Sequence, residues 1–394
     1  MLLRIFFLLI ICLQVQASEW SGHIDSEIRY FTQKPLATEQ YDGFNLSLAG
    51  QLEYHHEWDN GYQSFTFVPF VRVDQHDSER THMDIRELTW LKAARDWELR
   101  VGIRKLFWGV TESQHLVDII NQSDSVEHPD GEDKLGQPMV NLALIRDWGT
   151  VDLFILPGFR ERTFPARDGR LLGGGIPINV EQVSYESGAE EKHVDLAVRW
   201  SHTIGDWDIG LSHFSGTNRD PLLLPSFDVN NDLTLTPYYE QIQQTGLDIQ
   251  ITQEDMIWKF EAISRKGQEE RFTAMTGGLE YTFVGILDSD ADLGVLVEYL
   301  FDDRNENAST PFENDIMLGM RMTLNDTQST ELLAGTIISM ENESRSYLLE
   351  ASRRFGDSWK VSLEAYLYSN ISPTDLMYGM RNEDLMQLTL AWYF

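Results

Sequence analysis

Charged and apolar side chains alternate along several stretches of the sequence, and this spacing places the charges on one face of a β-strand. In residues 96–107 the polar positions are Glu98, Arg100, Gly102 and Arg104, and the positions between them are apolar. Because successive side chains of a strand point to opposite faces, the acid and the two arginines share one face. Opposed acids and arginines across a narrow water-filled space create a transverse field that orders water and dipolar solutes. The alternative is that these charges simply pair across neighbouring strands.

Six residues are candidates for the lining or constriction of such a space. Three precede a long connection on successive expected strands, two lie within this connection, and one lies on a later strand. In that order they are Arg72, Arg100 and Arg104; Glu112 and Asp118; and Arg321. The three arginines form a hypothetical basic wall, because their strands lead into the connection. Neutralising Arg100 and Arg104 together should then shift ion preference toward cations.

Two Asp-rich stretches, 228–232 and 288–292, place oxygen ligands at alternate positions, as calcium-binding loops do. Neither stretch has glycine at the next required position or glutamate at the twelfth, so polar turns explain both. The sequence therefore predicts no metal site and no cofactor.

An enzyme would need a nucleophile beside a base, and the residues that invite this interpretation surround one expected hairpin. They are His202, Ser212, His213 and Ser215. The sequence contains no Gly-x-Ser-x-Gly and no His-Glu-x-x-His motif. We therefore expect no enzymatic activity, with a lipid or peptide hydrolase as the alternative.

Period-two alternation recurs along the whole chain after residue 17 and indicates β-strands that must position these residues. In residues 45–56, Leu46, Leu48 and Leu52 share one face, opposite polar side chains. No later stretch approaches 18 consecutive apolar residues, which excludes helical membrane spans. A soluble sandwich and a membrane barrel both remain compatible with this alternation alone.

The connections between the expected strands separate these two fold classes. About eighteen strands, with sixteen as the alternative, are joined by tight turns and longer loops that mostly alternate. The tight turns include 59–61, 205 and 356–357, whereas 108–137 and 160–190 are long. Short turns on one rim and long loops on the other are typical of an antiparallel up-and-down barrel in the outer membrane. We therefore predict an all-β transmembrane barrel with periplasmic turns and extracellular loops.

Apolar residues occupy every second position of the last nine residues and end in an aromatic. These positions are Met386, Leu388, Leu390, Trp392 and Phe394. The pattern resembles the terminal signature of Gram-negative outer-membrane barrels, in which a final aromatic closes a strand that the barrel-assembly machinery recognises. This resemblance implies a cell outer-membrane location and contact with outer-membrane lipid and lipopolysaccharide.

Sixteen to eighteen strands leave an aqueous lumen that side chains cannot fill. No plug domain precedes the first expected strand, because only a few residues separate Ser18 from Trp20. The resemblance to a poorly characterised porin-like family therefore implies passive diffusion of small hydrophilic solutes. A structural, adhesion or secretion-related barrel is a further alternative. Many porins form homotrimers, but the sequence identifies no protomer contact face.

The long connection 108–137 is the best candidate for an inward-folded constriction loop. Thr111 could cap a short helix there, with Leu116, Ile119 and Ile120 as its apolar stripe. The dipeptide Trp108-Gly109 at a strand end is similar to a segment of several outer-membrane barrel families, in which it leads into an inward loop. The alternative is a surface loop that lies on the rim.

The first 17 residues have the features of a cleaved signal peptide. Arg4 precedes an apolar run from Ile5 to Leu13, and Val15-Gln16-Ala17 resembles a cleavage site. The only cysteine, Cys12, falls within this segment, so residues 18–394 form one cysteine-free barrel domain.

The net charge of −32, from 63 acidic and 31 basic residues, argues against nucleic acid as a partner.

Overall fold

The computed structural model describes residues 18–267 and 269–394, and the expected signal peptide lies outside the described residues. Eighteen strands form one antiparallel sheet. They are β1 (Ser18–Phe31), β2 (Phe44–Trp58), β3 (Gln63–Asp74), β4 (His82–Ala93), β5 (Trp97–Arg104), β6 (Gln137–Arg146), β7 (Gly149–Pro157), β9 (Val194–Ile204), β10 (Trp207–Thr217), β13 (Gln241–Gln253), β14 (Met256–Gly267), β15 (Glu269–Phe283), β16 (Asp292–Asp302), β17 (Asn314–Thr323), β18 (Glu331–Ser339), β19 (Arg345–Phe355), β20 (Trp359–Ser369) and β21 (Leu385–Tyr393).

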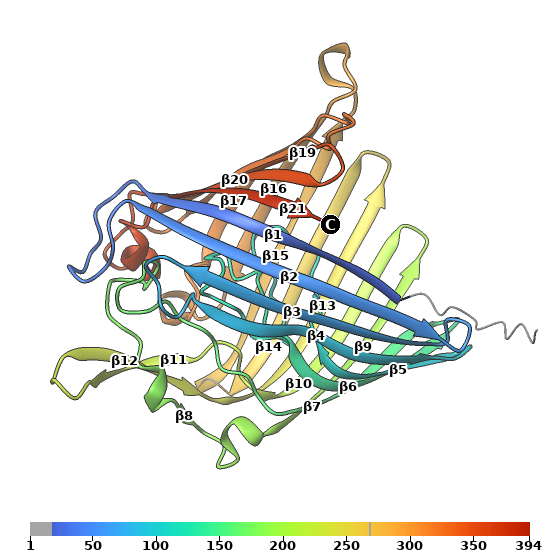
Figure 1. Ribbon diagram of the computed structural model, residues 1–394, viewed down its shortest axis with the longest axis horizontal. Coiled ribbons are helices and arrows are strands. Elements are labelled where there is room, and N and C mark those ends of the chain that lie inside the picture. Colours follow the sequence, from blue (N-terminus) through green and yellow to red (C-terminus); the bar gives the residue numbers. More distant parts are fainter. Residues whose placement is uncertain (1–17, 268) are drawn as a thin grey trace, which may run out of the picture.

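The sheet is a closed barrel, because its first strand pairs with both the second and the last. At the seam between β1 and β21, His23 lies opposite Tyr393, and Phe31 lies opposite Leu385. Figure 1 shows the long β1 and β2 ribbons crossing the view beside β21. The predicted all-β barrel of eighteen strands is confirmed.

Outward positions of the strands are apolar and exposed, whereas inward positions are polar or are covered from inside. On β2, Leu46 and Leu48 are exposed, and their neighbours Asn45 and Ser47 are buried. This is the pattern that a bilayer imposes, because the outer wall meets hydrocarbon and the inner wall meets water or protein. Among the described residues, no helix is long and apolar enough to cross a membrane.

Connections on one rim are mostly short and those on the other are mostly long. Residues 59–62, 147–148 and 205–206 form tight turns, whereas 105–136 and 158–193 are long. The C-terminus lies at the rim of the short turns (Figure 1). An exception occurs between β14 and β15, which are joined tightly on the rim of the long connections.

The long connections contain structure that the sequence analysis treated as irregular. β8 (Ser184–Tyr185), β11 (Leu222–Phe227) and β12 (Leu233–Tyr239) form a separate three-stranded sheet. The chain also has short 3-10 helices: η1 (Val180–Gln182), η2 (Glu190–Lys192), η3 (Ile286–Asp288), η4 (Asn305–Asn307) and η5 (Leu376–Met380).

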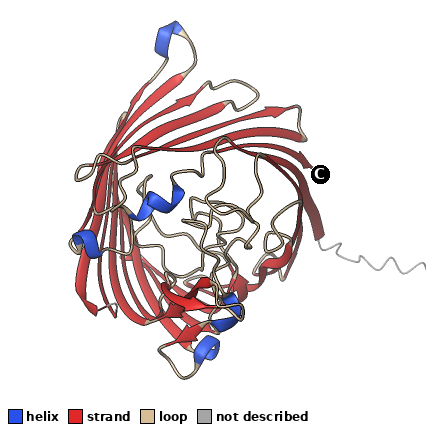
Figure 2. Cartoon of the chain, turned by 90° about the vertical axis from the view of Figure 1, so that its left-hand side faces the viewer, coloured by secondary structure: helices blue, strands red, loops and turns tan. Residues whose placement is uncertain are grey.

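The main apolar core lies inside the barrel. It joins residues of the connection 105–136, which we call the crossing segment, to the inner faces of β6, β7, β9, β10 and β13–β15. Its buried members are Trp108, Leu116, Val117, Ile119, Ile120, Met139, Phe154, Leu156, Ala197, Phe214, Ile242, Ile263, Phe272 and Ala274. Figure 2 shows connecting loops running through the interior of the ring of strands. A large part of the inner wall is therefore covered by protein rather than by water.

Candidate functional site

The first part of the crossing segment is held by two glutamates on the inner wall. Glu261 on β14 accepts hydrogen bonds at its Oε1 from the backbone N–H groups of Val110 (2.7 Å) and Thr111 (3.1 Å). Glu298 on β16 accepts from the N–H groups of Glu112 (2.8 Å) and Ser113 (2.9 Å). Hydrogen bonds to an ionised acceptor are stronger than neutral ones, so these carboxylates fix the backbone of the segment against the wall. The predicted helix capped by Thr111 is wrong, because this stretch is not helical.

Glu112 points from the crossing segment to two basic side chains of the wall. Its Oε2 lies 2.6 Å from Arg321 Nη2 on β17 and 3.5 Å from Lys259 Nζ on β14. Glu280 on β15 lies 3.5 Å from each of these two basic groups. The Arg321 side chain keeps 39 % of its surface exposed. The structure therefore brings two predicted site residues, Glu112 and Arg321, together in a partly open group of mixed charge.

The second part of the crossing segment is held by a buried ionic network on β1, β3 and the connection between β3 and β4. Arg72 Nη2 lies 2.7 Å from Glu127 Oε2, and Arg72 Nη1 lies 3.2 Å from Glu27 Oε2. Arg80 Nη2 lies 2.8 Å from Glu27 Oε1, and Arg29 Nε lies 3.1 Å from the same atom. Burial opposes ionisation of Glu127, but Arg72 and Arg80 outweigh it and lower its pKa.

His128 attaches the end of this part to the opposite side of the seam. Its Nε2 lies 2.9 Å from Glu364 Oε2 on β20, and its Nδ1 lies 2.7 Å from Asp130 Oδ2. Burial disfavours the imidazolium, but the hydrogen bonds to Asp130 and Glu364 outweigh it and raise the pKa of His128 to about 10. His128 is therefore a charged link between two carboxylates at neutral pH.

The remaining predicted site residues lie in three separate surroundings. Arg72 is only 7 % exposed and belongs to the buried network, so it is not part of an open wall. Arg100 pairs with Glu98, and Arg104 Nη1 donates to Asn141 Oδ1 at 3.2 Å. Asp118 is buried 3.3 Å from Lys134 Nζ, and burial raises the pKa of this carboxyl.

The sequence analysis did not identify Glu261 and Glu364 as anchors of the crossing segment. The available signal in the sequence was that each glutamate occupies a polar position of an alternating stretch, and therefore the inner face of its expected strand. Their partners lie more than one hundred residues away in the chain, and no local pattern specifies such pairs. Glu298 and His128 were not singled out at all.

The described residues bring three metal-ligating side chains together: His82, Asp124 and Glu127. His82 Nε2 lies 3.5 Å from Glu127 Oε1 and 3.8 Å from Asp124 Oδ2. However, Arg86 Nη1 already lies 2.6 Å from Asp124 Oδ2, and Arg72 binds Glu127. These guanidinium groups repel a cation and occupy the carboxylate oxygens that it would need.

Of the candidate hydrolase residues, Ser212 and His213 do not form a catalytic pair. Ser212 is buried, and its neighbour His213 contacts Thr245 Oγ1 at 2.9 Å. Because consecutive residues of β10 point to opposite faces, Ser212 and His213 cannot act on one substrate atom.

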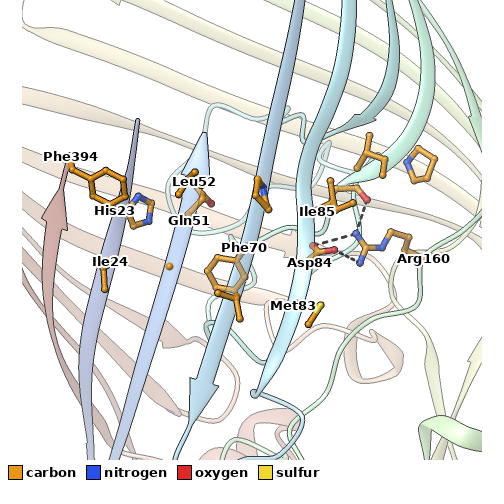
Figure 3. A pocket seen from close by; sticks show the side chains of 16 residues that line it. His23, Ile24, Gln51, Leu52, Phe70, Met83, Asp84, Ile85, Arg160 and Phe394 are labelled. Atoms are coloured by element: carbon orange, nitrogen blue, oxygen red, sulfur yellow. Dashed lines mark hydrogen bonds and ion pairs between the residues drawn. The ribbon is translucent and has the colours of Figure 1, made fainter. Parts of the chain in front are cut away.

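A cavity of about 950 Å³ lies in the barrel wall rather than beside the charged groups of the interior. Exposed apolar side chains such as Ile24, Val71 and Met83 line it (Figure 3). At one end of this cavity, Asp84 Oδ1 forms an ion pair with Arg160 Nη2 at 2.9 Å. This ion pair lies beside the point where the chain leaves β5 and enters the interior. Because outward side chains of the wall line most of this cavity, we do not assign it to the candidate site.

Comparison with known protein families and with curated proteins finds no match. Solved structures do match the fold. OccAB3 of Acinetobacter baumannii has a TM-score of 0.55 at 8 % identity, covering 96 % of this chain and 99 % of that protein. A trimer form of OmpT from Vibrio cholerae has a TM-score of 0.47 at 8 % identity, with 96 % and 99 % covered. A mutant of the Rh. blastica porin has a TM-score of 0.46 at 11 % identity, with 96 % and 100 % covered.

Among these three structures, OccAB3 alone scores above 0.5, and its low identity restricts the comparison to the fold. The chain thus has the fold of a porin-like outer-membrane β-barrel.

Proposed function

We propose that this protein is an outer-membrane channel for passive diffusion of small hydrophilic solutes, and that the crossing segment narrows its lumen. The observation that carries the proposal is the attachment of this segment to opposite sides of a closed eighteen-stranded barrel. Glu261 and Glu298 hold one part, whereas Arg72 and Glu364 hold the other. A barrel of this width has an aqueous interior unless protein fills it, and an inward segment reduces that interior.

The mixed charges around Glu112 support passage of polar solutes. Glu112, Arg321, Lys259 and Glu280 meet where the crossing segment approaches β14–β17. Oppositely charged groups facing each other across a lumen order water and favour polar over apolar solutes. Arg104 contributes further positive charge on β5, whereas Glu98 neutralises Arg100, the other arginine of the proposed basic wall on this strand.

Single-channel recording of the purified full chain in planar bilayers tests the proposal. We expect stable open steps with a measurable ion preference. The variant Arg321→Gln should shift the reversal potential toward cations, because it removes an exposed positive charge and leaves Glu112 less neutralised. Silence in the bilayer together with hydrolysis of lipid or peptide would instead support the enzyme alternative.

The proposal extends to location and partners. A leader at residues 1–17 would export the chain, the barrel-assembly machinery would insert it, and the outer wall would contact lipid and lipopolysaccharide. We also propose a homotrimer, which chemical cross-linking of the protein in native membranes would detect as a band of three protomers.

A further inference from the structure

Like charges face each other on the inner side of the β19–β20 hairpin. Glu350 lies directly opposite Glu364, and Arg354 lies directly opposite Lys360. Ser352 and Ser362 form the pair between them. Like charges opposite each other destabilise an antiparallel pair, whereas opposite charges would stabilise it. These like-charge pairs therefore reduce the stability of the hairpin.

This face of the hairpin is the inner one. Glu364 contacts His128 of the crossing segment, which lies inside the barrel. The alternate residues Leu349, Leu363 and Ala365 occupy the other face. The four charges therefore border the interior rather than the lipid.

Most of these charges lack partners. Within residues 18–267 and 269–394, Glu350 and Lys360 make no hydrogen bond or ion pair through their side chains. Arg354 is exposed and lies over the Tyr393 ring, with its guanidinium carbon 5.7 Å from the ring centroid. Glu364 accepts hydrogen bonds from His128 and Gln387.

Several strand charges elsewhere on the inner wall are matched in pairs. Arg199 on β9 lies 2.7 Å from Asp248 on β13. Asp195 on β9 lies 2.7 Å from Arg219, in the connection that follows β10. Such pairs neutralise each other, so they attract solutes weakly. Among the described residues, Glu350, Arg354 and Lys360 have no such ion pair and are instead available to a solute, whereas Glu364 is bound by His128.

The two like-charge pairs form two poles along the lumen. The positive pole lies next to the short turn 356–358, and the negative pole lies nearer the middle of the barrel. Four residues of antiparallel strand separate Glu350 from Arg354, which corresponds to about 13 Å. Asp130 and Glu132 of the crossing segment add negative charge near Glu350, and His128 adds one positive charge there.

We propose that the β19–β20 hairpin is a two-point track for zwitterionic solutes with a terminal ammonium and a terminal carboxylate, such as short peptides. The ammonium binds Glu350, beside the His128-bound Glu364, and the carboxylate binds the guanidinium and ammonium groups of the other pole. An extended peptide of three residues spans roughly 10 Å, and flexible side chains bridge the remainder. The inference rests on the proposed channel function and adds its substrate class.

Swelling of proteoliposomes with four probes of matched backbone tests the track. The probes are triglycine (zwitterion), triglycine amide (cation), N-acetyl-triglycine (anion) and N-acetyl-triglycine amide (neutral). Through the unmodified protein, triglycine should enter about two- to tenfold faster than the neutral probe, the range that two partly exposed charge contacts give. Glu350→Gln should slow the cation selectively, and Lys360→Gln should slow the anion selectively.

A charge swap provides the matched control. Glu350→Lys combined with Lys360→Glu preserves composition and net charge but places opposite charges across the hairpin at both positions. This variant should be at least as thermostable as the unmodified protein and should lose the preference for triglycine. Because it gains cross-strand ion pairs, failure to fold does not account for the loss.

Equal entry of triglycine and the neutral probe through a conducting protein would overturn the track and leave the channel proposal standing. Retention of the triglycine preference by the charge swap would overturn the track as well. Absence of conductance and of swelling with every probe would overturn both proposals.

Discussion

At the residue scale, the charges that hold the crossing segment differ in burial, and burial decides how much each contributes. Arg72 is 7 % exposed and contacts two glutamates, whereas the Arg321 side chain is 39 % exposed and pairs with Glu112. Water screens the exposed pair but not the buried one. The same type of side chain therefore has a structural role on β3 and the proposed role toward solutes on β17.

Substitution of Arg72 should lower the stability of the barrel substantially. Arg72→Ala leaves Glu127 and Glu27 buried with fewer positive partners, and breaking a buried ionic group in this way costs about 3–5 kcal/mol. Thermal unfolding in detergent micelles measures the loss. Arg321→Ala is the control, because an exposed pair is worth about 0–1 kcal/mol. Equal melting of the two variants would contradict the structural role of Arg72.

The His128 link should depend on pH with a defined sign. The pKa of His128 is raised to about 10, so its stabilisation is complete below the ordinary histidine value and is lost as the pH rises through about 10. Burial raises the pKa of Asp130, but hydrogen bonding to His128 outweighs burial and lowers this pKa. The stabilisation that the ionised Asp130 gives to the link is therefore lost only when the pH falls through this lowered value. The link should hold throughout the neutral range.

A spin label at Glu132→Cys reports this link, because the only native cysteine, Cys12, lies in the expected signal peptide. In the otherwise unmodified protein the label should become more mobile above about pH 10. With His128→Gln it should be mobile at every pH. A label that is equally immobile in both proteins at pH 7 would show that His128 does not hold the segment.

At the element scale, the backbone of the crossing segment must pass very close to the barrel wall where the segment joins β6. A Cβ atom on Gly136 would lie 2.5 Å from Ile103 Cγ2 and 2.7 Å from the Arg86 carbonyl oxygen. Real Cβ contacts are longer than this, and a strand carbonyl cannot move without disturbing β4. Glycine at this position therefore permits the chain to pass beside β4 and join β6.

Gly136→Ala should consequently destabilise the barrel by about 1–3 kcal/mol, the usual cost of overpacking. Thermal unfolding measures the change. Gly188→Ala is the matched control, because a Cβ there meets nothing within 4 Å. The prediction fails if the two alanine variants unfold at the same temperature.

The strands were predictable from sequence because their signal is local. Leu46 and Leu48 alternate with polar residues, and this alternation alone gives a strand and its two faces. The paired sheet β11–β12 was missed because its strands are short, and the expected helix at Thr111 does not form because Glu261 binds this backbone instead. Which inner charges are covered depends on contacts across the barrel, such as that between Arg72 and Glu127, and sequence spacing does not encode these contacts.

At the scale of the whole molecule, the barrel reverses the usual distribution of polarity. Leucines such as Leu48 and Leu388 are exposed on the outer wall, whereas charged side chains such as Arg80 and Glu261 are buried inside. This distribution is stable only if hydrocarbon surrounds the outer wall and the inner charges find partners. The closed hydrogen-bonded seam between β1 and β21 is essential to it, because an open edge would leave backbone groups unpaired in lipid.

The last residue completes this seam. The Phe394 N–H donates to the Gly22 carbonyl oxygen at 3.1 Å, and the Gly22 N–H donates to the Phe394 carbonyl oxygen at 3.1 Å. The Phe394 ring packs against Trp392, with centroids 5.1 Å apart, and covers Gly22, where a Cβ would meet the ring at 3.0 Å. The backbone bonds do not need an aromatic side chain, so the ring itself should matter more for recognition during assembly than for final stability.

Phe394→Ala should therefore reduce the amount of folded protein in the outer membrane several-fold, while the barrel that does form melts close to the unmodified protein. The heat-modifiable band of the outer-membrane fraction measures assembly, and thermal unfolding of the purified barrel measures stability. Phe355→Ala is the control, because Phe355 is an outward aromatic of similar exposure, 52 % against 51 %, next to a short turn on the same rim. If both variants lower assembly equally, the loss reflects a missing aromatic on the outer wall, and the terminal position has no special role in insertion.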